Sequence, residues 1–215
     1  LRTAAHRYPK EPRWNDDVAL LIKTYLGLND TRKARYWVDK YAKVSRRRNP
    51  DIDYFTAYLL EGASPKKARE QYERNIKAHP RDHRNYLRLG LLNARSKETL
   101  AAAVGQLKRA ASLADTIPEA WLEIARAYRR LGKHEEELNA LQVFVASDPQ
   151  HPEANARIGE LMLAQGKTGE ALERLESANE ATSDDPRILV ALARGYASSG
   201  RIGPAIEALE KARRI

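Results

Sequence analysis

Apolar residues recur at helical spacing on both sides of Gly132, within residues 118–149. Before the glycine, an i, i+3, i+4, i+7 pattern marks one helix face, at Trp121, Ile124, Ala125 and Tyr128. After it, a second apolar stripe runs through Leu138, Leu141 and Val145. Glycine often follows the last residue of a helix, and proline cannot continue one. The pattern therefore predicts two helices, joined by a turn at Gly132 and stopped before Pro149.

The same pattern returns every 34 residues through the second half of the chain. Three sets of positions share this spacing: Pro118, Pro152 and Pro186; Gly132, Gly166 and Gly200; Leu141, Leu175 and Leu209. Such a fixed period indicates a repeat protein. Weaker matches extend the frame upstream, with one copy a residue longer. The repeats that we expect are 15–48, 49–82, 83–117, 118–151, 152–185 and 186–215, after a remnant of a preceding repeat at 1–14.

These residues resemble the tetratricopeptide repeat. The family pattern is carried here by Trp121, Ile124, Ala125, Tyr128, Leu141, Phe144 and Pro149. Glu137 departs from it, because the family prefers a small residue there. The resemblance implies an all-α, right-handed superhelical solenoid of helix-turn-helix hairpins, in which motif residues such as Trp121 and Tyr128 belong to the core. It also implies a non-catalytic scaffold whose first helices line a concave groove for a peptide or protein partner.

Arginine recurs at the positions that the family turns toward this groove. The groove candidates are Tyr54, Arg84, Arg88, Arg126, Arg129, Arg130, Arg157 and Arg194. Guanidinium groups pair well with carboxylates, which favours an acidic partner, captured mainly by Arg88, Arg126, Arg157 and Arg194. Glutamates also occupy groove positions, so the alternative is a solvated face on which Arg and Glu of successive repeats pair with each other.

The net charge of +9 is concentrated near the N-terminus. Residues 1–82 hold 19 Lys and Arg against 11 Asp and Glu, whereas the remainder is nearly balanced. Aromatic and basic residues interleave over 31–50, a pattern that suits an anionic polymer and that ends in the basic patch Arg46, Arg47 and Arg48. The same residues fit a basic helix on the convex side, with cations at its C-terminal end. We therefore regard nucleic acid as an unfavoured partner, and an anionic polymer as an alternative one.

Other functional classes find no support. The chain has no cysteine, and Pro80 separates His79 from His83, so we expect no metal site. No phosphate-binding loop, dinucleotide-binding glycine pattern or nucleophile–base pair is present, so we expect no enzyme, catalytic residue or cofactor. No apolar run reaches the roughly 18 residues of a membrane span.

The ends of the sequence suggest a segment of a longer array, because we identify no polar capping helix there. Uncapped ends would also allow the chain to form a homo-oligomer. Long arrays of this kind resemble those of bacterial exopolysaccharide export proteins. By that analogy we expect a cytoplasmic or periplasmic location, with the periplasm favoured.

Overall fold

The computed structural model describes residues 14–45, 49–114, 117–182 and 184–215. Within these ranges the chain forms α-helices and one short 3-10 helix, η1 (Lys97–Thr99), with no β-strand. The expected all-α fold is therefore confirmed. The remnant expected at 1–14 lies outside the described residues except for Trp14.

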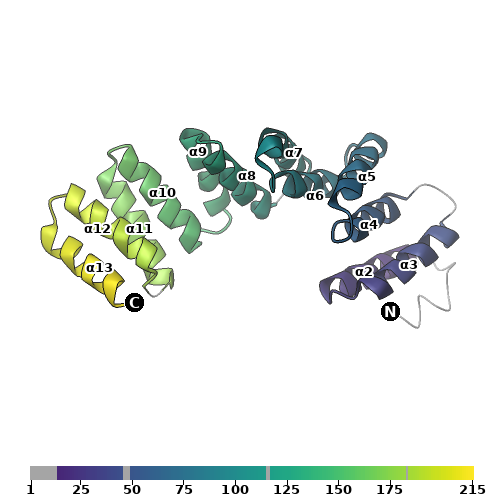
Figure 1. The fold of residues 1–215 in the computed structure, drawn as a ribbon, viewed down its shortest axis with the longest axis horizontal. Helices are drawn as coiled ribbons and strands as arrows, with labels where there is room; N and C mark the ends of the chain where they lie inside the picture. The colour runs from purple at the N-terminus through teal and green to yellow at the C-terminus, as the bar shows by residue number, and fades with distance from the viewer. Residues whose placement is uncertain (1–13, 46–48, 115–116, 183) are drawn as a thin grey trace.

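In the part of the chain that the structure describes, the helices form six consecutive hairpins, which build an elongated arch (Figure 1). They are α2 (Trp14–Gly27) with α3 (Thr31–Val44), α4 (Pro50–Leu60) with α5 (Pro65–Ala78), α6 (His83–Asn93) with α7 (Leu100–Leu113), α8 (Pro118–Arg130) with α9 (His134–Val145), α10 (Pro152–Ala164) with α11 (Thr168–Thr182), and α12 (Pro186–Ser198) with α13 (Ile202–Arg214). In the middle of the arch, α5, α7 and α9 lie on the outer side, whereas α4, α6 and α8 lie on the inner side (Figure 1).

Local sequence chemistry explains where the helices begin. Proline stands in the first turn of α4, α5, α8, α10 and α12, where its missing N–H would have no helical partner. The side chains of Asp30, Asn49, Asp82 and Asp185 accept hydrogen bonds from backbone N–H groups at the starts of their helices.

The last three hairpins turn at equivalent glycines. Gly132, Gly166 and Gly200 have φ of 71°, 76° and 76°, in the left-handed region that residues with a Cβ rarely adopt. After Gly132, the N–H of Lys133 donates to the carbonyl of Tyr128, and Lys167 and Arg201 make the corresponding bond in the next two turns. This pattern ends a helix with its last carbonyls satisfied. The predicted role of glycine as a helix terminator thus agrees with the geometry.

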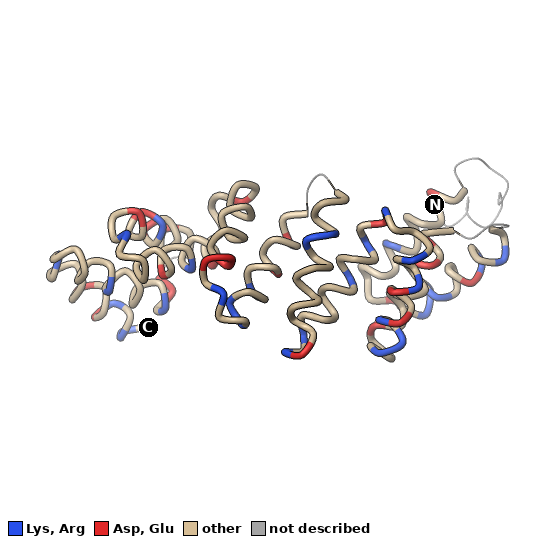
Figure 2. Tube along the Cα trace, turned by 90° about the horizontal axis from the view of Figure 1, so that it is seen from above, with Lys and Arg blue, Asp and Glu red and all other residues tan. Residues whose placement is uncertain are grey.

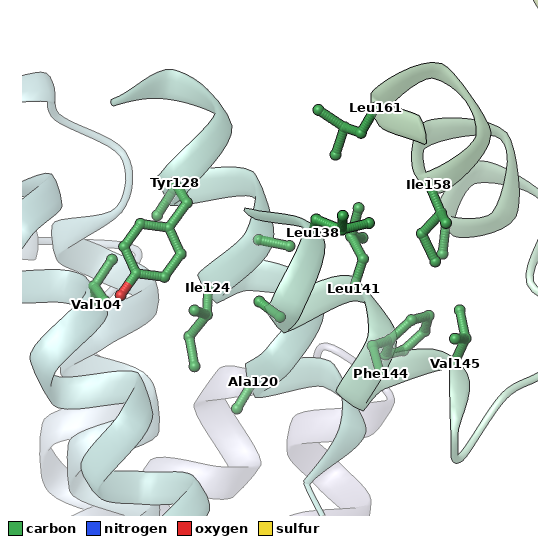
Figure 3. Close-up of a cluster of buried hydrophobic side chains, with 14 of the residues drawn as sticks. Val104, Ala120, Ile124, Tyr128, Leu138, Leu141, Phe144, Val145, Ile158 and Leu161 are labelled. Carbon is green, nitrogen blue, oxygen red and sulfur yellow. The ribbon is translucent and has the colours of Figure 1, made fainter. Parts of the chain in front are cut away.

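The core consists of side chains shared between neighbouring hairpins. Figure 3 shows one such cluster, in which Ile124 and Tyr128 of α8, Leu141 and Phe144 of α9, and Ile158 of α10 lie together. Each is at most 8% exposed. Because each hairpin packs against its neighbours along the chain, the fold is a quasi-one-dimensional solenoid.

The last helix lacks such a neighbour on one face. Ile206 and Leu209 of α13 are 52% and 49% exposed, whereas their equivalents one repeat earlier, Leu172 and Leu175, are 7% and 0% exposed. In the preceding hairpin these positions are covered by α12, the first helix of the following repeat. An apolar stripe of α13 therefore remains open in the described structure.

Candidate partner-binding surface

The groove candidates fall on the first helices α4, α6, α8, α10 and α12, and most of the arginines among them are already paired. Figure 2 shows basic and acidic positions interspersed along the tube rather than separated into blocks. The carboxylates that each arginine binds determine which guanidinium groups remain available to a partner protein.

Arg84 links the second and third hairpins. Its guanidinium donates to Asp51 of α4 at 2.7 Å and to Asp82 at 2.8 Å. The same guanidinium lies over the ring of Tyr54, 4.7 Å from its centroid. Burial raises the pKa of Tyr54 to about 12. The two candidates Tyr54 and Arg84 are therefore in contact with each other, and two carboxylates also hold Arg84.

Arg88 makes a second link between the same hairpins. Its Nε donates to Oε1 of Glu61 at 2.8 Å, and its Nη2 donates to Oε2. The Tyr72 hydroxyl donates to the same Oε1 at 2.6 Å. Arg88 also lies 4.6 Å from the centroid of the Tyr58 ring. Glu61 is 9% exposed, so its charge is satisfied by one fork and one hydroxyl rather than by water.

Arg157 makes the corresponding link between the fourth and fifth hairpins. Its Nε and Nη2 donate to the two carboxylate oxygens of Glu137, at 2.6 Å and 2.9 Å, and its Nη1 donates to Glu160 at 2.8 Å. The Glu137 side chain is 2% exposed. The hydrogen bonds that Arg157 donates to Glu137 raise the pKa of the Arg157 guanidinium. Glu137, which departs from the family pattern, is thus bound by an arginine of the next repeat.

The remaining candidates divide into paired and unpaired arginines. Arg126 donates to Glu123 and to Glu153 of α10, at 2.8 Å each, but with its side chain 46% exposed. Arg130 donates to the carbonyl of Ala94. Arg129 and Arg194 are exposed, and within the described ranges neither has a carboxylate partner. Within the described ranges they are the two predicted groove arginines that have neither a carboxylate nor a backbone carbonyl as a hydrogen-bond partner.

Two hollows lie along this row of first helices. One of about 300 Å³ is bounded by α4, α6 and α8, with Glu61, Arg88 and Glu123 among its lining residues. Another of about 270 Å³ is bounded mainly by α8, α10 and α12, with Arg129, Ala156 and Ile188 in its lining. Each combines apolar side chains with charged groups from successive repeats, as a surface for a protein segment requires.

Sequence reasoning missed the buried acceptors of these arginines. Glu61 and Glu137 were not candidates, although Glu137 was noted as a departure from the pattern. A buried glutamate needs a charged partner, so a carboxylate at a core position is the available signal. Its partner was not identifiable, because Arg157 is 20 residues away and on another hairpin.

The predicted basic patch Arg46, Arg47 and Arg48 lies outside the described residues. Among the residues that the structure does describe, no group of three His, Asp or Glu side chains is arranged to hold a metal ion. No helix in the same ranges is both long enough and apolar enough to span a bilayer.

Solved structures with the same architecture share little sequence with this chain. A structure of MamA is 20% identical, with a TM-score of 0.66, over 75% of this chain and 91% of that one. PilF of Pseudomonas aeruginosa is 15% identical, with a TM-score of 0.73, over 93% and 90% of the two chains. YrrB, described as a TPR protein with an unusual peptide-binding site, is 18% identical, with a TM-score of 0.69, over 77% and 86%. At these identities the similarity establishes the fold alone.

Sequence comparison identifies the family. No curated protein matches the chain. One tetratricopeptide repeat model matches residues 138–194 and 162–215, and a second matches residues 100–152. The matches together span residues 100–215, which is more than half of the chain. With the solenoid of helical hairpins, they establish that this chain belongs to the tetratricopeptide repeat family.

Proposed function

We propose that the chain is a non-catalytic scaffold that binds a segment of a partner protein along its row of first helices. The observation that carries this proposal is the open hollow of about 270 Å³ that is bounded mainly by three successive first helices. Ala156 and Ile188 give it an apolar lining, and Arg129 contributes an unpaired cation. An extended segment laid across the three helices would cover apolar surface and place a carboxylate beside Arg129.

The ion pairs narrow the choice of arginines that recognise an acidic partner. Arg88 and Arg157 hold buried carboxylates, and a ligand would have to displace these at the cost of leaving a charge buried and unpaired. Arg126 is paired but exposed, so exchange with a ligand carboxylate costs little there. We therefore assign carboxylate capture to Arg129 and Arg194, with Arg126 as an auxiliary contact, while Arg88 and Arg157 hold the repeats in register.

An array of immobilised peptides with varied acidic and apolar content tests this assignment. We expect some acidic peptides to bind along α8–α12, and the variant Arg129→Glu/Arg194→Glu to lose that group of peptides while keeping its helical circular dichroism. Arg109→Glu, an exposed arginine of α7, is the matched control and should bind normally. The proposal fails if no peptide binds, or if the double variant binds every peptide as tightly as the original chain does.

The exposed stripe of α13 favours a second function, self-association. Ile202, Ile206 and Leu209 lie at i, i+4 and i+7 and are each about half exposed, at 57%, 52% and 49%. Analytical ultracentrifugation over a range of concentrations should reveal oligomers that Ile206→Arg/Leu209→Arg abolishes. A strict monomer at all concentrations would exclude this function for the chain as given.

A cellular setting can be proposed only by family analogy. We place the chain in a larger bacterial protein, on the periplasmic side of an envelope assembly such as a polysaccharide exporter. Fractionation of cells that carry the tagged, full-length protein tests this placement, and recovery in the cytosol alone would contradict it.

A further inference from the structure

A hollow of about 750 Å³ lies apart from the α8–α12 surface, where the first three hairpins meet. It has more than twice the volume of either hollow described above. Arg32 and Arg35 contribute from the start of α3, Tyr58 and Leu59 from the end of α4, and Arg95 from the turn after α6. The hollow therefore joins residues that are far apart in sequence and come from three consecutive repeats.

The charge lining this hollow is uncompensated. Arg32, Arg35 and Arg95 are exposed, and over the described ranges none of them forms an ion pair. The one carboxylate in the lining is Glu61, which is already bound by Arg88 and Tyr72.

The nearby carboxylate of Asp30 is also engaged. It accepts the backbone N–H of Lys33 at 3.0 Å and the ammonium of the same lysine at 2.6 Å. Neither Glu61 nor Asp30 is therefore available to neutralise the three arginines. Among the described residues, the hollow thus brings three arginines without a carboxylate partner to one place.

The rest of the lining indicates which anion fits. Leu26, Leu59 and Ala63 supply apolar surface between the arginines. A nucleic acid would present phosphates and need cations spread along a backbone track, with rings free for stacking. Here the ring of Tyr58 is already covered by Arg88. Apolar side chains alternating with guanidinium forks suit a peptide in which apolar residues alternate with Asp or Glu.

We propose that this hollow, lined by Arg32, Arg35 and Arg95, binds an acidic peptide segment of a partner protein. Glutamate or aspartate side chains pair with the three guanidinium groups, and an apolar residue rests on Leu26 and Leu59. The inference does not depend on the proposed function of α8–α12, because it uses different residues. The hollow shares Glu61 and Arg95 with the 300 Å³ hollow, so a longer segment can continue from one into the other.

Binding would also couple the three repeats. The three guanidinium groups belong to the first and third hairpins, whereas Tyr58 and Leu59 belong to the second. A ligand that holds all of them stabilises the packing of these hairpins, since binding to the native state alone raises apparent stability.

Fluorescence anisotropy with a labelled peptide tests the site. The probe is a peptide of about ten residues in which glutamate alternates with leucine, roughly 33 Å when extended. Its matched control has glutamine in place of glutamate. We expect the acidic peptide to bind, with an affinity that falls as salt rises, and the glutamine peptide to bind at least about tenfold more weakly.

Variants locate the binding. Arg32→Glu/Arg35→Glu/Arg95→Glu should weaken the acidic peptide by at least about tenfold, whereas Arg109→Glu, an exposed arginine outside the hollow, should not. Arg35→Lys/Arg95→Lys keeps the charge but removes the planar fork, so an intermediate loss is expected. This lysine variant keeps the test decisive if the triple glutamate variant does not fold.

Three results would overturn the inference. The first is equal binding of the acidic peptide by the lysine variant and the unmodified chain. The second is equal binding of the glutamate and glutamine peptides. The third is a single-stranded DNA oligonucleotide that binds at least about tenfold more tightly than the acidic peptide and loses affinity in the triple variant, which would make the hollow a polyanion site.

Discussion

Arg157 of α10 holds the carboxylate of Glu137 in α9 through two hydrogen bonds, at 2.6 Å from Nε and 2.9 Å from Nη2. The pair crosses from the fourth hairpin to the fifth, and Arg88 with Glu61 makes a similar crossing from the third to the second. Both arginines stand at the sixth position of their predicted repeats. The solenoid thus uses buried forks, in addition to apolar packing, to fix how one repeat sits on the next.

Removal of Arg157 is expected to destabilise the chain more than removal of Glu137. Arg157→Leu leaves the 2% exposed carboxylate of Glu137 without its main partner, which costs about 3–5 kcal/mol. Glu137→Leu leaves Arg157 with Glu160 and some access to water, so the loss should be smaller. Urea unfolding followed by circular dichroism measures both. Arg126→Leu, which breaks an exposed pair, is the control and should cost at most about 1 kcal/mol. Equal losses for all three variants would contradict this view of the pair.

Two helical glycines should respond in opposite ways to alanine. In Gly159→Ala the new Cβ would stand 2.6 Å from Cγ of Leu175 and 3.0 Å from the carbonyl oxygen of Ala171, so we expect a loss of about 1–3 kcal/mol. Gly105 lies within α7 with nothing within 4 Å of the added Cβ, so Gly105→Ala should stabilise by about 0.5–1 kcal/mol. Thermal unfolding of the two variants measures the difference, and a shift of the same sign in both would refute the prediction.

The Tyr72 hydroxyl should contribute measurably to stability. Tyr72 is fully buried and donates to Glu61 at 2.6 Å, so Tyr72→Phe removes one of the partners of a buried carboxylate. A loss of about 1–3 kcal/mol is expected. Tyr86→Phe is the matched control, because in the described residues its hydroxyl has no hydrogen-bond partner, and it should change stability by at most about 0.5 kcal/mol. Comparable urea midpoints for the two variants would argue against a structural role for the hydroxyl.

Alkaline pH should unfold the chain through its buried tyrosines. Burial raises the pKa of Tyr54 to about 12, and burial raises the pKa of Tyr72 well above its usual range. Above pH 10 the unfolded chain releases these phenolic protons while the native chain keeps them, so stability falls as pH rises toward 12. Absorbance of tyrosinate at 295 nm and circular dichroism at 222 nm, recorded together, test this. All tyrosines ionising near pH 10 with helices intact would contradict it.

The hairpins could be predicted from the sequence because the apolar helix positions and the turn glycines recur every 34 residues. The longer copy at 83–117 is also intelligible from the structure, since η1 extends the turn between Asn93 and Leu100. The carboxylate partners of the groove arginines could not be predicted from the sequence. They depend on how far each hairpin is rotated on the next, which brings Arg88 to a residue 27 positions away and Arg126 to Glu153, also 27 positions away.

The hollow at Arg32, Arg35 and Arg95 was equally beyond sequence reasoning. The excess of basic residues near the N-terminus was visible, but it was assigned to a convex helix and to residues 46–48. Arg95 follows a helix end in the longer copy, and no periodic position marked it. The three side chains line one hollow only because α3 and the turn after α6 approach the end of α4.

Gly132, Gly166 and Gly200 share a left-handed backbone conformation, so the last three hairpins have equivalent turns. Residues 152–185 form one complete period between two prolines that begin equivalent helices. Deletion of this repeat would connect the preceding hairpin to an equivalent helix. Duplication of it would insert another hairpin with the same connections at both ends. The C-terminal half of the chain can therefore be lengthened or shortened by whole repeats, and the remaining helices would keep their orientation.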